Sequence, residues 1–239
     1  MATVKSQERF KTAKGVFDNF TERNLFELHS RGIFDELVTP LKVGKESNVF
    51  LAKHGSETRI VKIYRVQNCD FNRMFEYIRQ DPRYEYLKKH KREIIFAWTQ
   101  REYKNLLKAH RAGVNVPKPY SWKFNILVEE MIGDEHVALP LKDTKPQNPA
   151  AFLELILHEM KKLYRAGLIH GDLSSFNILN KNESPVLIDF SQATVVKTPN
   201  SHELLRRDIK NILQFFRKLG VKREEEEILN LILEKKADN

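Results

Sequence analysis

The sequence predicts an α+β protein, with a sheet-rich N-terminal lobe followed by a helical C-terminal lobe. Three short runs rich in Val, Leu, Ile and Phe lie at 38–43, 48–53 and 59–64, and turn-forming residues separate them. Helical spacing of apolar residues is more frequent further along the chain. Strands that come first and helices that come afterwards are typical of this fold class.

An N-terminal helix is expected over 5–31, because apolar side chains recur near helical spacing and Gly32 follows as a stop. The three strand candidates form an antiparallel meander. Pro40 places the first strand at a sheet edge or delays its start. A longer helix is expected over 88–112, where apolar residues share one side and Gly113 ends the pattern.

The second half of the chain is expected to hold a strand, a proline-punctuated connector, a helix, two short strands and two closing helices. These elements are assigned to 124–131, 134–149, 150–166, 178–180, 186–188 and the segments from about 201 and 223. The sequence therefore divides into an N-terminal helical extension at 1–34, an N-lobe at 35–133 and a C-lobe at 134–239.

Composition narrows the class of protein. Hydrophobic residues make up 41% and charged residues 31% of the 239 residues, which is globular rather than disordered composition. The longest apolar stretches are too short to cross a bilayer, and the N-terminus lacks the apolar core of a secretory signal. A single cysteine, Cys69, cannot form an internal disulfide. We expect a cytoplasmic protein without a membrane partner.

The net charge of +9, from 41 Lys and Arg against 32 Asp and Glu, fits an anionic partner such as nucleic acid. Six of the basic residues and two tyrosines fall within 79–92. Basic and aromatic side chains together can bind phosphates and bases. We expect this segment to be a flexible basic insertion that helps to bind RNA, although a solvated surface would show the same charge.

The strongest chemical signal is the segment Ile-His-Gly-Asp172-Leu-Ser-Ser-Phe-Asn177. An Asp followed five residues later by Asn, between a helix and a strand, matches a kinase catalytic loop. In such loops the Asp reaches the attacking group and the Asn binds a metal on the phosphates. Leu-Ile-Asp189-Phe comes next, which places an acidic residue at the end of an apolar strand, as in a D-F-G metal site.

Upstream, Lys62 in Arg-Ile-Val-Lys-Ile-Tyr resembles the strand lysine that contacts the α and β phosphates of ATP. Its ion-pair partner is expected on the next long helix. Glu102 is the preferred candidate, because it lies on the same helical face as Trp98 and Leu106 and therefore needs a buried partner. Glu93 is the alternative.

A candidate phosphate loop, Val-Gly44-Lys45-Glu-Ser47-Asn-Val-Phe, separates the first two strands. It contains one glycine, so it is neither a G-x-G-x-x-G loop nor a Walker loop. Gly44, Lys45 and Ser47 would still offer a backbone amide, a cation and a hydroxyl group to a triphosphate.

These motifs together resemble the RIO family of atypical protein kinases, and its type-one branch best. The resemblance spans about residues 35–215. It rests on the phosphate-loop segment, on His-Gly-Asp-Leu-Ser with Asn177, and on Ile-Asp-Phe-Ser-Gln-Ala at 188–193. Asp-Pro-Arg at 81–83 and the helix at 98–106 indicate the branch.

The resemblance implies a two-lobed kinase fold that binds ATP with Mg²⁺ or Mn²⁺, and a role in maturing the small ribosomal subunit and its RNA. By the same resemblance, Lys62 and Ser47 would bind phosphate, Asp172 would be the catalytic acid/base, and Asn177 and Asp189 would bind metal. Asp189 would also form an acyl-phosphate during ATP hydrolysis. A protein substrate or autophosphorylation remains open.

Adenine would be read by the backbone of the hinge strand, through the Glu130 carbonyl and the Ile132 amide. Glu129 falls where an apolar gatekeeper is usual, which is a departure from the kinase pattern. The segment after Asp189 lacks the D-F-G glycine, and no A-P-E motif is found after it. These departures favour ATPase action or a very restricted substrate.

Three other functions share some of these features. A small-molecule kinase of the choline or aminoglycoside type has a similar loop but a larger helical lobe. A small kinase-like ATPase of a tRNA-modification complex has a similar size. A non-catalytic RNA-binding scaffold would not need Lys62, Asp172, Asn177 and Asp189 together.

Overall fold

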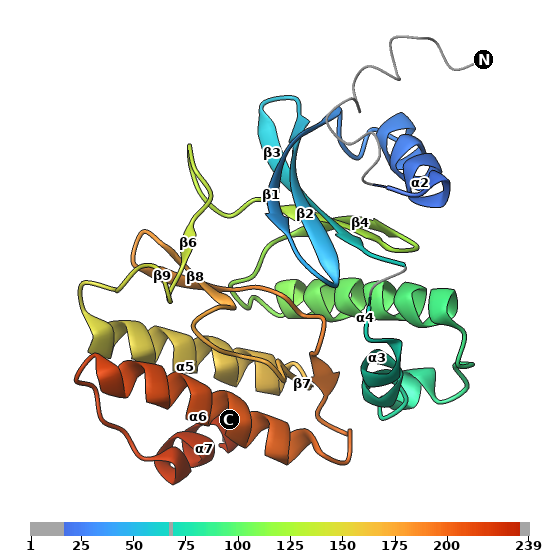
Figure 1. Ribbon diagram of the computed structural model, residues 1–239. Coiled ribbons are helices and arrows are strands. Elements are labelled where there is room, and N and C mark those ends of the chain that lie inside the picture. Colours follow the sequence, from blue (N-terminus) through green and yellow to red (C-terminus); the bar gives the residue numbers. More distant parts are fainter. Residues whose placement is uncertain (1–16, 67–68, 235–239) are drawn as a thin grey trace. The chain divides into compact units, whose positions relative to one another are not determined.

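A computed structural model describes residues 17–66 and 69–234 (Figure 1). The chain divides into two compact units, which we call the sheet unit and the helical unit. The sheet unit holds the described residues up to Arg79, together with Tyr84–Tyr103 and Lys118–Met131. The helical unit holds Gln80–Arg83, Lys104–Pro117 and the described residues from Ile132 onward. Residues 80–83, 104–117 and 132–133, assigned to the N-lobe from sequence, thus belong to the helical unit.

An antiparallel five-stranded sheet with the order β1-β2-β3-β5-β4 forms the sheet unit. Its strands are β1 (Glu36–Val43), β2 (Ser47–His54), β3 (Glu57–Tyr64), β4 (Pro119–Lys123) and β5 (Ile126–Glu130). The first three form the expected meander. Strand β1 lies at an edge, and its pairing with β2 shifts register between Pro40 and Lys42, because proline has no amide hydrogen to donate to the ladder.

Helix α2 (Asn19–Ser30) packs on the sheet unit's core through Leu25 and Leu28. It begins where the Asp18 carboxylate accepts a hydrogen bond from the Thr21 amide, a capping arrangement that sets the start of the helix. The helix expected over 5–31 is therefore confirmed over α2, and its part at 5–16 lies outside the described residues.

Several short elements were missed in the sequence. Helix α3 (Phe71–Ile78) and the 3-10 turn η2 (Pro82–Tyr84) lie between the third expected strand and the helix expected over 88–112, where no helix or strand was predicted. Helix α3 has only eight residues, and its buried side chains, Met74 and Ile78, give too short a periodic pattern to recognise. Strand β4 begins with a proline, which argues against a strand unless it lies at an edge, as it does here.

Helix α4 (Lys91–Arg111) runs as one continuous helix (Figure 1), and the division between the units falls within it, after Tyr103. It matches the helix expected over 88–112. The strand expected over 124–131 begins only at Ile126, because Phe124 lies in the turn after β4 with a φ of 50°.

The helical unit is built from α5 (Pro149–Arg165), α6 (Ser201–Lys218) and α7 (Glu225–Leu233), and Figure 1 shows α6 running alongside α5. Asn148 caps α5 and Pro149 occupies its first turn, where a missing amide hydrogen costs nothing. Five short strands pair in two small sheets: β6 (Leu139–Pro140), β8 (Ile178–Lys181) and β9 (Ser184–Leu187), and β7 (Leu168–Ile169) with β10 (Thr194–Val195).

The strands β8 and β9 lie between two of the candidate site residues, Asn177 and Asp189. Strand β8 begins directly after Asn177, and Asp189 follows β9 by two residues. In the described part of the chain, every helix is too short or too polar to span a bilayer.

Candidate active site

The candidate phosphate loop is a tight turn between β1 and β2. The Gly44 amide donates to the Ser47 carbonyl at 3.0 Å, and a Cβ on Gly44 would lie 2.8 Å from that oxygen. The turn therefore has no room for a side chain at Gly44. The Glu46 carbonyl accepts a hydrogen bond from the Arg65 amide at 2.8 Å and lies 3.3 Å from the Cys69 sulfur, which is closer to the Arg65 carbonyl, at 2.9 Å. The loop is thus held through its backbone.

Lys45 is exposed and Ser47 is half-buried on this turn. A cation and a hydroxyl group on a backbone-anchored turn are suited to binding phosphate oxygens. Burial raises the pKa of the Cys69 thiol to about 11, so the thiol is protonated at neutral pH and can donate to the Arg65 carbonyl beside the loop.

The predicted ion pair between Lys62 and Glu102 is present. Lys62 Nζ lies 2.7 Å from Glu102 Oε1, and the Tyr64 hydroxyl donates to Glu102 Oε2 at 2.5 Å. Lys62 and Tyr64 are two residues apart on β3 and therefore point to the same face of the sheet. The alternative partner, Glu93, is exposed in the first turn of α4.

Both members of this pair are buried, with 8% of Lys62 and 1% of Glu102 exposed. A buried carboxylate is tolerated when its lone pairs accept hydrogen bonds, and here each oxygen accepts one. The pair therefore fixes the lysine side chain at one place on β3.

The hinge residues fall in different units, so each is described on its own. In the sheet unit, the Glu130 amide donates to the Lys118 carbonyl, and Glu130 Oε2 accepts from the Lys118 amide at 3.0 Å. In the helical unit, Ile132 is buried against Leu179 and Val186, and its carbonyl accepts from Ala138. The adenine contacts of Glu130 and Ile132 stay predictions.

In the helical unit, the candidate catalytic loop brings Asp172 and Asn177 together. Asn177 Nδ2 donates to the Asp172 carbonyl at 2.8 Å and to Asp172 Oδ2 at 3.3 Å. Both residues are half-buried. Because the amide nitrogen is directed at Asp172, the amide oxygen of Asn177 is directed away from it and can serve as a ligand.

A residue that the sequence did not reveal holds this loop. Asp208 of α6 is buried and accepts hydrogen bonds from the Gly171 and Leu173 amides, both at 2.8 Å. Those amides flank Asp172. On the same helix, Arg207 donates to the Gly171 carbonyl, and Asn211 Nδ2 donates to the Leu173 carbonyl at 3.2 Å. Helix α6 therefore clamps the backbone on both sides of Asp172.

Burial raises the pKa of Asp208 to about 7, and the two amide hydrogen bonds and the nearby Arg207 oppose this rise. A signal was available in the sequence: Asp208 lies among Leu204, Leu205, Ile209 and Ile212 on the apolar face of α6. A carboxylate on the buried face of a helix requires partners, but the sequence did not show that these would be backbone amides 35 to 37 positions earlier.

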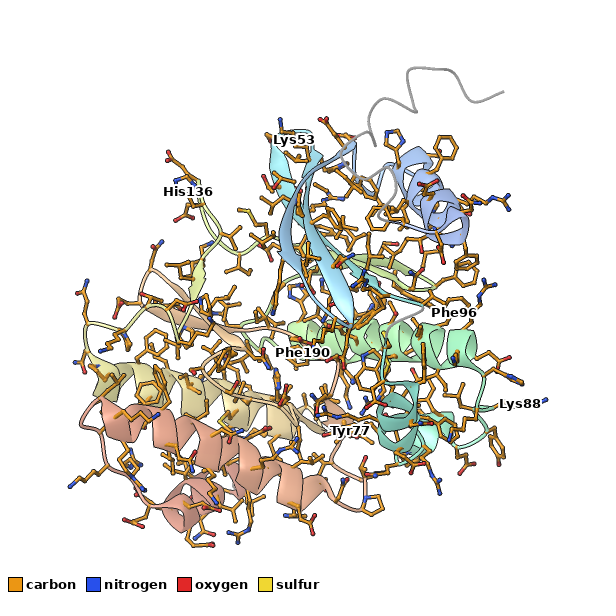
Figure 2. The ribbon with its side chains drawn as sticks, viewed as in Figure 1. Lys53, Tyr77, Lys88, Phe96, His136 and Phe190 are labelled. Atoms are coloured by element: carbon orange, nitrogen blue, oxygen red, sulfur yellow. The ribbon has the colours of Figure 1, made fainter. Side chains whose placement is uncertain are left out.

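The segment that carries Asp189 is joined to the catalytic loop. The Ile188 amide donates to the Asn177 carbonyl, and the Ile188 carbonyl accepts from His170 Nε2, both at 3.0 Å. The rings of His170 and Phe190 lie 5.0 Å apart. Phe190 is fully buried, and its side chain is labelled in Figure 2. His170 and Phe190 thus join the segments before Asp172 and after Asp189.

His170 is neutral in this arrangement. Burial lowers the pKa of its imidazole to about 4. A backbone carbonyl only accepts hydrogen bonds, so Nε2 carries the ring proton and Nδ1 does not.

Asp189 itself has a φ of 63°, in the left-handed region that residues with a Cβ rarely adopt. Its Oδ1 accepts a hydrogen bond from the Ser191 amide at 3.4 Å. Strained backbone conformations of this kind are concentrated at functional sites, and Asp adopts the left-handed region more readily than most residues. The turn therefore directs the carboxylate differently from the strand before it.

The donor atoms in the helical unit fit Mg²⁺. Asp189 offers carboxylate oxygens and Asn177 an amide oxygen, and hard cations of this size prefer oxygen ligands. Among the described residues, no cluster of three or more His, Cys, Asp or Glu side chains would cage a metal. One or two protein ligands supplemented by substrate phosphates are usual for Mg²⁺.

A second buried network in the helical unit holds the segment after Asp189. Arg83 binds the buried Asp81 through two nitrogen atoms, at 2.9 and 2.6 Å. Arg83 also donates to Asn105 Oδ1 at 2.9 Å, and Asn105 Nδ2 donates to the Ala193 carbonyl at 2.7 Å. The expected flexible insertion at 79–92 is therefore anchored at its start, because Asp81 is buried and paired.

Comparison with known proteins defines the class and then the family. The fold is similar to that of a solved kinase: the Rio2 kinase–ADP/Mg²⁺–phosphoaspartate complex from Chaetomium thermophilum has a TM-score of 0.68 at 23% identity, and the match covers 89% of this chain and 66% of that chain. The model of the RIO domain family matches residues 48–229. The chain belongs to the RIO family and is an atypical serine/threonine protein kinase.

Two archaeal relatives indicate the branch. The RIO-type serine/threonine-protein kinase Rio1 of Haloferax volcanii is 40% identical over 220 residues, which cover 91% of this chain and 76% of the relative. Rio1 of Methanocaldococcus jannaschii is also 40% identical, over 97% of this chain and 80% of the relative. The resemblance to the type-one branch and the expected α+β kinase fold are confirmed. Family membership argues against the small-molecule kinase and the tRNA-complex ATPase.

Proposed function

We propose that this enzyme binds ATP with Mg²⁺ and transfers the γ-phosphoryl group with Asp172 as the acid/base and Asp189 and Asn177 as metal ligands. The observation that carries the proposal is the hydrogen-bonded pair of Asn177 and Asp172, clamped on both sides by α6. Mn²⁺ would suit the same oxygen donors.

Most of the groups proposed to bind the nucleotide come from the sheet unit, and Ile132 comes from the helical unit. Lys62, held by Glu102, places a fixed positive charge against the α and β phosphates, and Lys45 and Ser47 contact the triphosphate from the phosphate loop. The Glu130 carbonyl and the Ile132 amide bind the adenine edge. When bound, Mg²⁺ offsets the charge that develops on the phosphate oxygens.

We further propose that the first phosphoryl acceptor is Asp189. An Asp189 carboxylate oxygen bonds to the γ-phosphorus, the bond from that phosphorus to the β–γ bridging oxygen breaks, and ADP leaves. Water then attacks the phosphorus of the acyl-phosphate, and Asp172 accepts a proton from that water. Inorganic phosphate is released and the Asp189 carboxylate is regenerated. A phosphoaspartate is present in the Rio2 complex named above. The left-handed turn at Asp189 supports an aimed, reactive carboxylate.

The proposed setting is cytoplasmic maturation of the small ribosomal subunit. The net charge of +9 supports an RNA partner. The four basic residues at the start of α4 and just before it are exposed, and Lys88 points outward in Figure 2; they are Lys88, Lys89, Lys91 and Arg92. A protein substrate, or this chain itself, would be the final acceptor when transfer replaces hydrolysis.

ATP turnover with γ-labelled ATP and Mg²⁺ tests the catalytic proposal. Wild type, Asp172→Ala and Asp189→Asn are compared without added substrate, and the protein is assayed for hydroxylamine-labile label. We expect turnover to fall by about a hundredfold or more in both variants, with hydroxylamine-labile label in wild type and Asp172→Ala and none in Asp189→Asn. Turnover that survives Asp189→Asn would exclude the phosphoaspartate route.

RNA binding tests the ribosomal part. Neutralising Lys88, Lys89, Lys91 and Arg92 together should weaken binding to ribosomal RNA fragments and reduce the slope of log affinity against log salt, because fewer counterions are released. Equal affinity at every salt concentration would remove this segment from the RNA-binding surface.

A further inference from the structure

A groove in the helical unit borders the candidate catalytic loop. Its volume is about 580 Å³. One wall is the loop segment Ser174–Phe176, which lies between Asp172 and Asn177. The other is the C-terminal half of α6, with Asn211, Phe215, Arg217 and Lys218. The proposed phosphotransfer chemistry gives no role to this groove.

The groove offers an aromatic surface. Phe176 is 63% exposed, although it lies beside buried residues of the catalytic loop. The ammonium group of Lys142 lies 5.1 Å from the centre of its ring. Phe215, half-buried on α6, packs edge-on against Phe216 at 5.3 Å. One exposed aromatic residue is common on protein surfaces, but an exposed and a half-buried one along the same groove are suited to an apolar side chain of a partner.

The charge of the groove has one sign. Arg217 and Lys218 are exposed, and neither forms an ion pair with any residue in the described part of the chain. No acidic side chain is among the lining residues. Lys142 is at the edge and pairs with Asp143, which is itself exposed. Arg217 and Lys218 also interact favourably with the negative end of the α6 dipole, but this stabilising role does not require a groove.

The groove is fixed relative to the catalytic carboxylate. Asn211 lies in its wall and also binds the Leu173 carbonyl, next to Asp172. The Lys142 amide donates to the Ser175 carbonyl at 3.0 Å, which holds the other side of the loop. A chain lying in this groove would therefore run beside the segment that carries Asp172.

We infer that this groove binds the protein acceptor of the phosphoryl group, through an acidic segment that carries an aromatic or large apolar side chain near its serine or threonine. Acidic side chains would pair with Arg217 and Lys218, and the apolar side chain would pack on Phe176. The inference rests on the proposed kinase activity. It adds that the acceptor is selected by negative charge and by one apolar contact.

The test uses the full chain and short synthetic peptides of equal length. The first peptide has one serine flanked by glutamates and a phenylalanine. In the second, lysines replace the glutamates, and in the third, alanine replaces the phenylalanine. Transfer of label from γ-labelled ATP gives kcat and KM for each, and basal ATP turnover is measured without peptide.

We expect the acidic peptide to be the best substrate. The double variant Arg217→Glu and Lys218→Glu should raise its KM by roughly tenfold, because two attractive contacts become repulsive. The control reverses Lys210 and Lys222, two exposed lysines outside the groove, and changes the net charge equally. It should leave KM unchanged, and both variants should keep basal turnover.

A second variant tests the aromatic contact. Phe176→Ala should remove the difference in KM between the phenylalanine and alanine peptides, and Phe176→Tyr should restore it. Equal KM in wild type and in the groove variants, or no transfer to any peptide despite normal ATP turnover, would overturn the inference alone. Loss of binding to oligouridylate in the groove double variant, without preference for the acidic peptide, would assign the groove to RNA. Absent wild-type turnover would instead overturn the proposed function.

Discussion

Lys62 in the sheet unit is positioned by a carboxylate that it touches, whereas Asp172 in the helical unit is positioned by a carboxylate that binds the backbone on either side of it. In the first case Glu102 pairs with the functional side chain directly. In the second, Asp208 accepts the amides of Gly171 and Leu173.

The difference fits the task that we propose for each side chain. A lysine that binds phosphate keeps one charge throughout, so an ion pair can hold it in place. A carboxylate that accepts and releases a proton should not be tied by a strong partner, because such a partner would shift its pKa. Holding the neighbouring backbone fixes the position of Asp172 without a direct bond from Asp208.

The largest effect is expected in the sheet unit. Glu102→Ala leaves Lys62 buried without its carboxylate and should lower the free energy of unfolding by about 3–5 kcal/mol, as measured by urea denaturation. Adding Lys62→Met should recover part of that loss, since the unpaired charge is gone. A double variant less stable than Glu102→Ala would contradict the ion-pair account.

In the helical unit, the histidine beside the clamped loop should make stability depend on pH. The pKa of His170 is about 4 when folded and about 6.5 when unfolded, so only the unfolded chain gains a proton between these values. Stability should therefore fall as pH decreases from 6.5 to 4, by on the order of 3 kcal/mol more than in His170→Phe.

Unfolding of both proteins by urea across this pH range supplies the measurement. Asp208 has a raised pKa of about 7 and acts with the opposite sign, because its contribution is lost as pH rises. It is present in both proteins, so its effect cancels in the difference. Parallel curves for wild type and His170→Phe would mean that His170 is not held neutral.

The backbone clamp itself is tested by Asp208→Asn. The amide group presents an NH₂ to one of the two backbone amides, so one hydrogen bond is lost. We expect kcat to fall by about 10–100-fold with little change in KM for ATP, and stability to fall by about 1–3 kcal/mol. Asp208→Glu, which keeps both acceptors, is the control. A raised KM with unchanged kcat would place the effect on nucleotide binding instead.

The smallest effect is expected at the phosphate loop. Gly44→Ala forces the turn open by a few tenths of an ångström, because its Cβ would lie 2.8 Å from the Ser47 carbonyl oxygen. The expected cost is about 1 kcal/mol in ATP affinity, measured by calorimetry. Gly55→Ala is the comparison: its Cβ has open space but its φ is 58°, so it introduces backbone strain without a steric clash and away from the phosphate loop, and it should leave ATP affinity unchanged.

The sequence predicted one half of the site more completely than the other. The pair of Lys62 and Glu102 could be predicted because each residue lies on an element with a clear period. Lys62 lies on a strand, and Glu102 lies four residues after Trp98 on a helix. Asp208 was not, because its partners are backbone groups, which have no signature in the sequence. The same limit hid the bond from Asn105 to the Ala193 carbonyl.

The fold shows a similar contrast. The meander, α4, α5 and α6 were predicted because each is long enough to display its period or its stop signal. Helix α3 and strand β4 were missed, since one is short and the other begins with proline. The anchoring of the start of the basic insertion was not predicted. In the sequence Asp81 and Arg83 resemble ordinary surface charges, and only the structure shows that Arg83 binds the buried Asp81.

Helix α4 has a consequence for how this sequence can change in evolution. Glu102 and Asn105 are three residues apart on it, and each makes a buried polar contact. Each residue added to a helix rotates all later positions by about 100° around its axis. An insertion or deletion between them would therefore rotate one contact away from its partner, whereas 85–90 lies outside any helix or strand and escapes this constraint. Among relatives, insertions and deletions should therefore be common in the segment 85–90 and rare between Glu102 and Asn105.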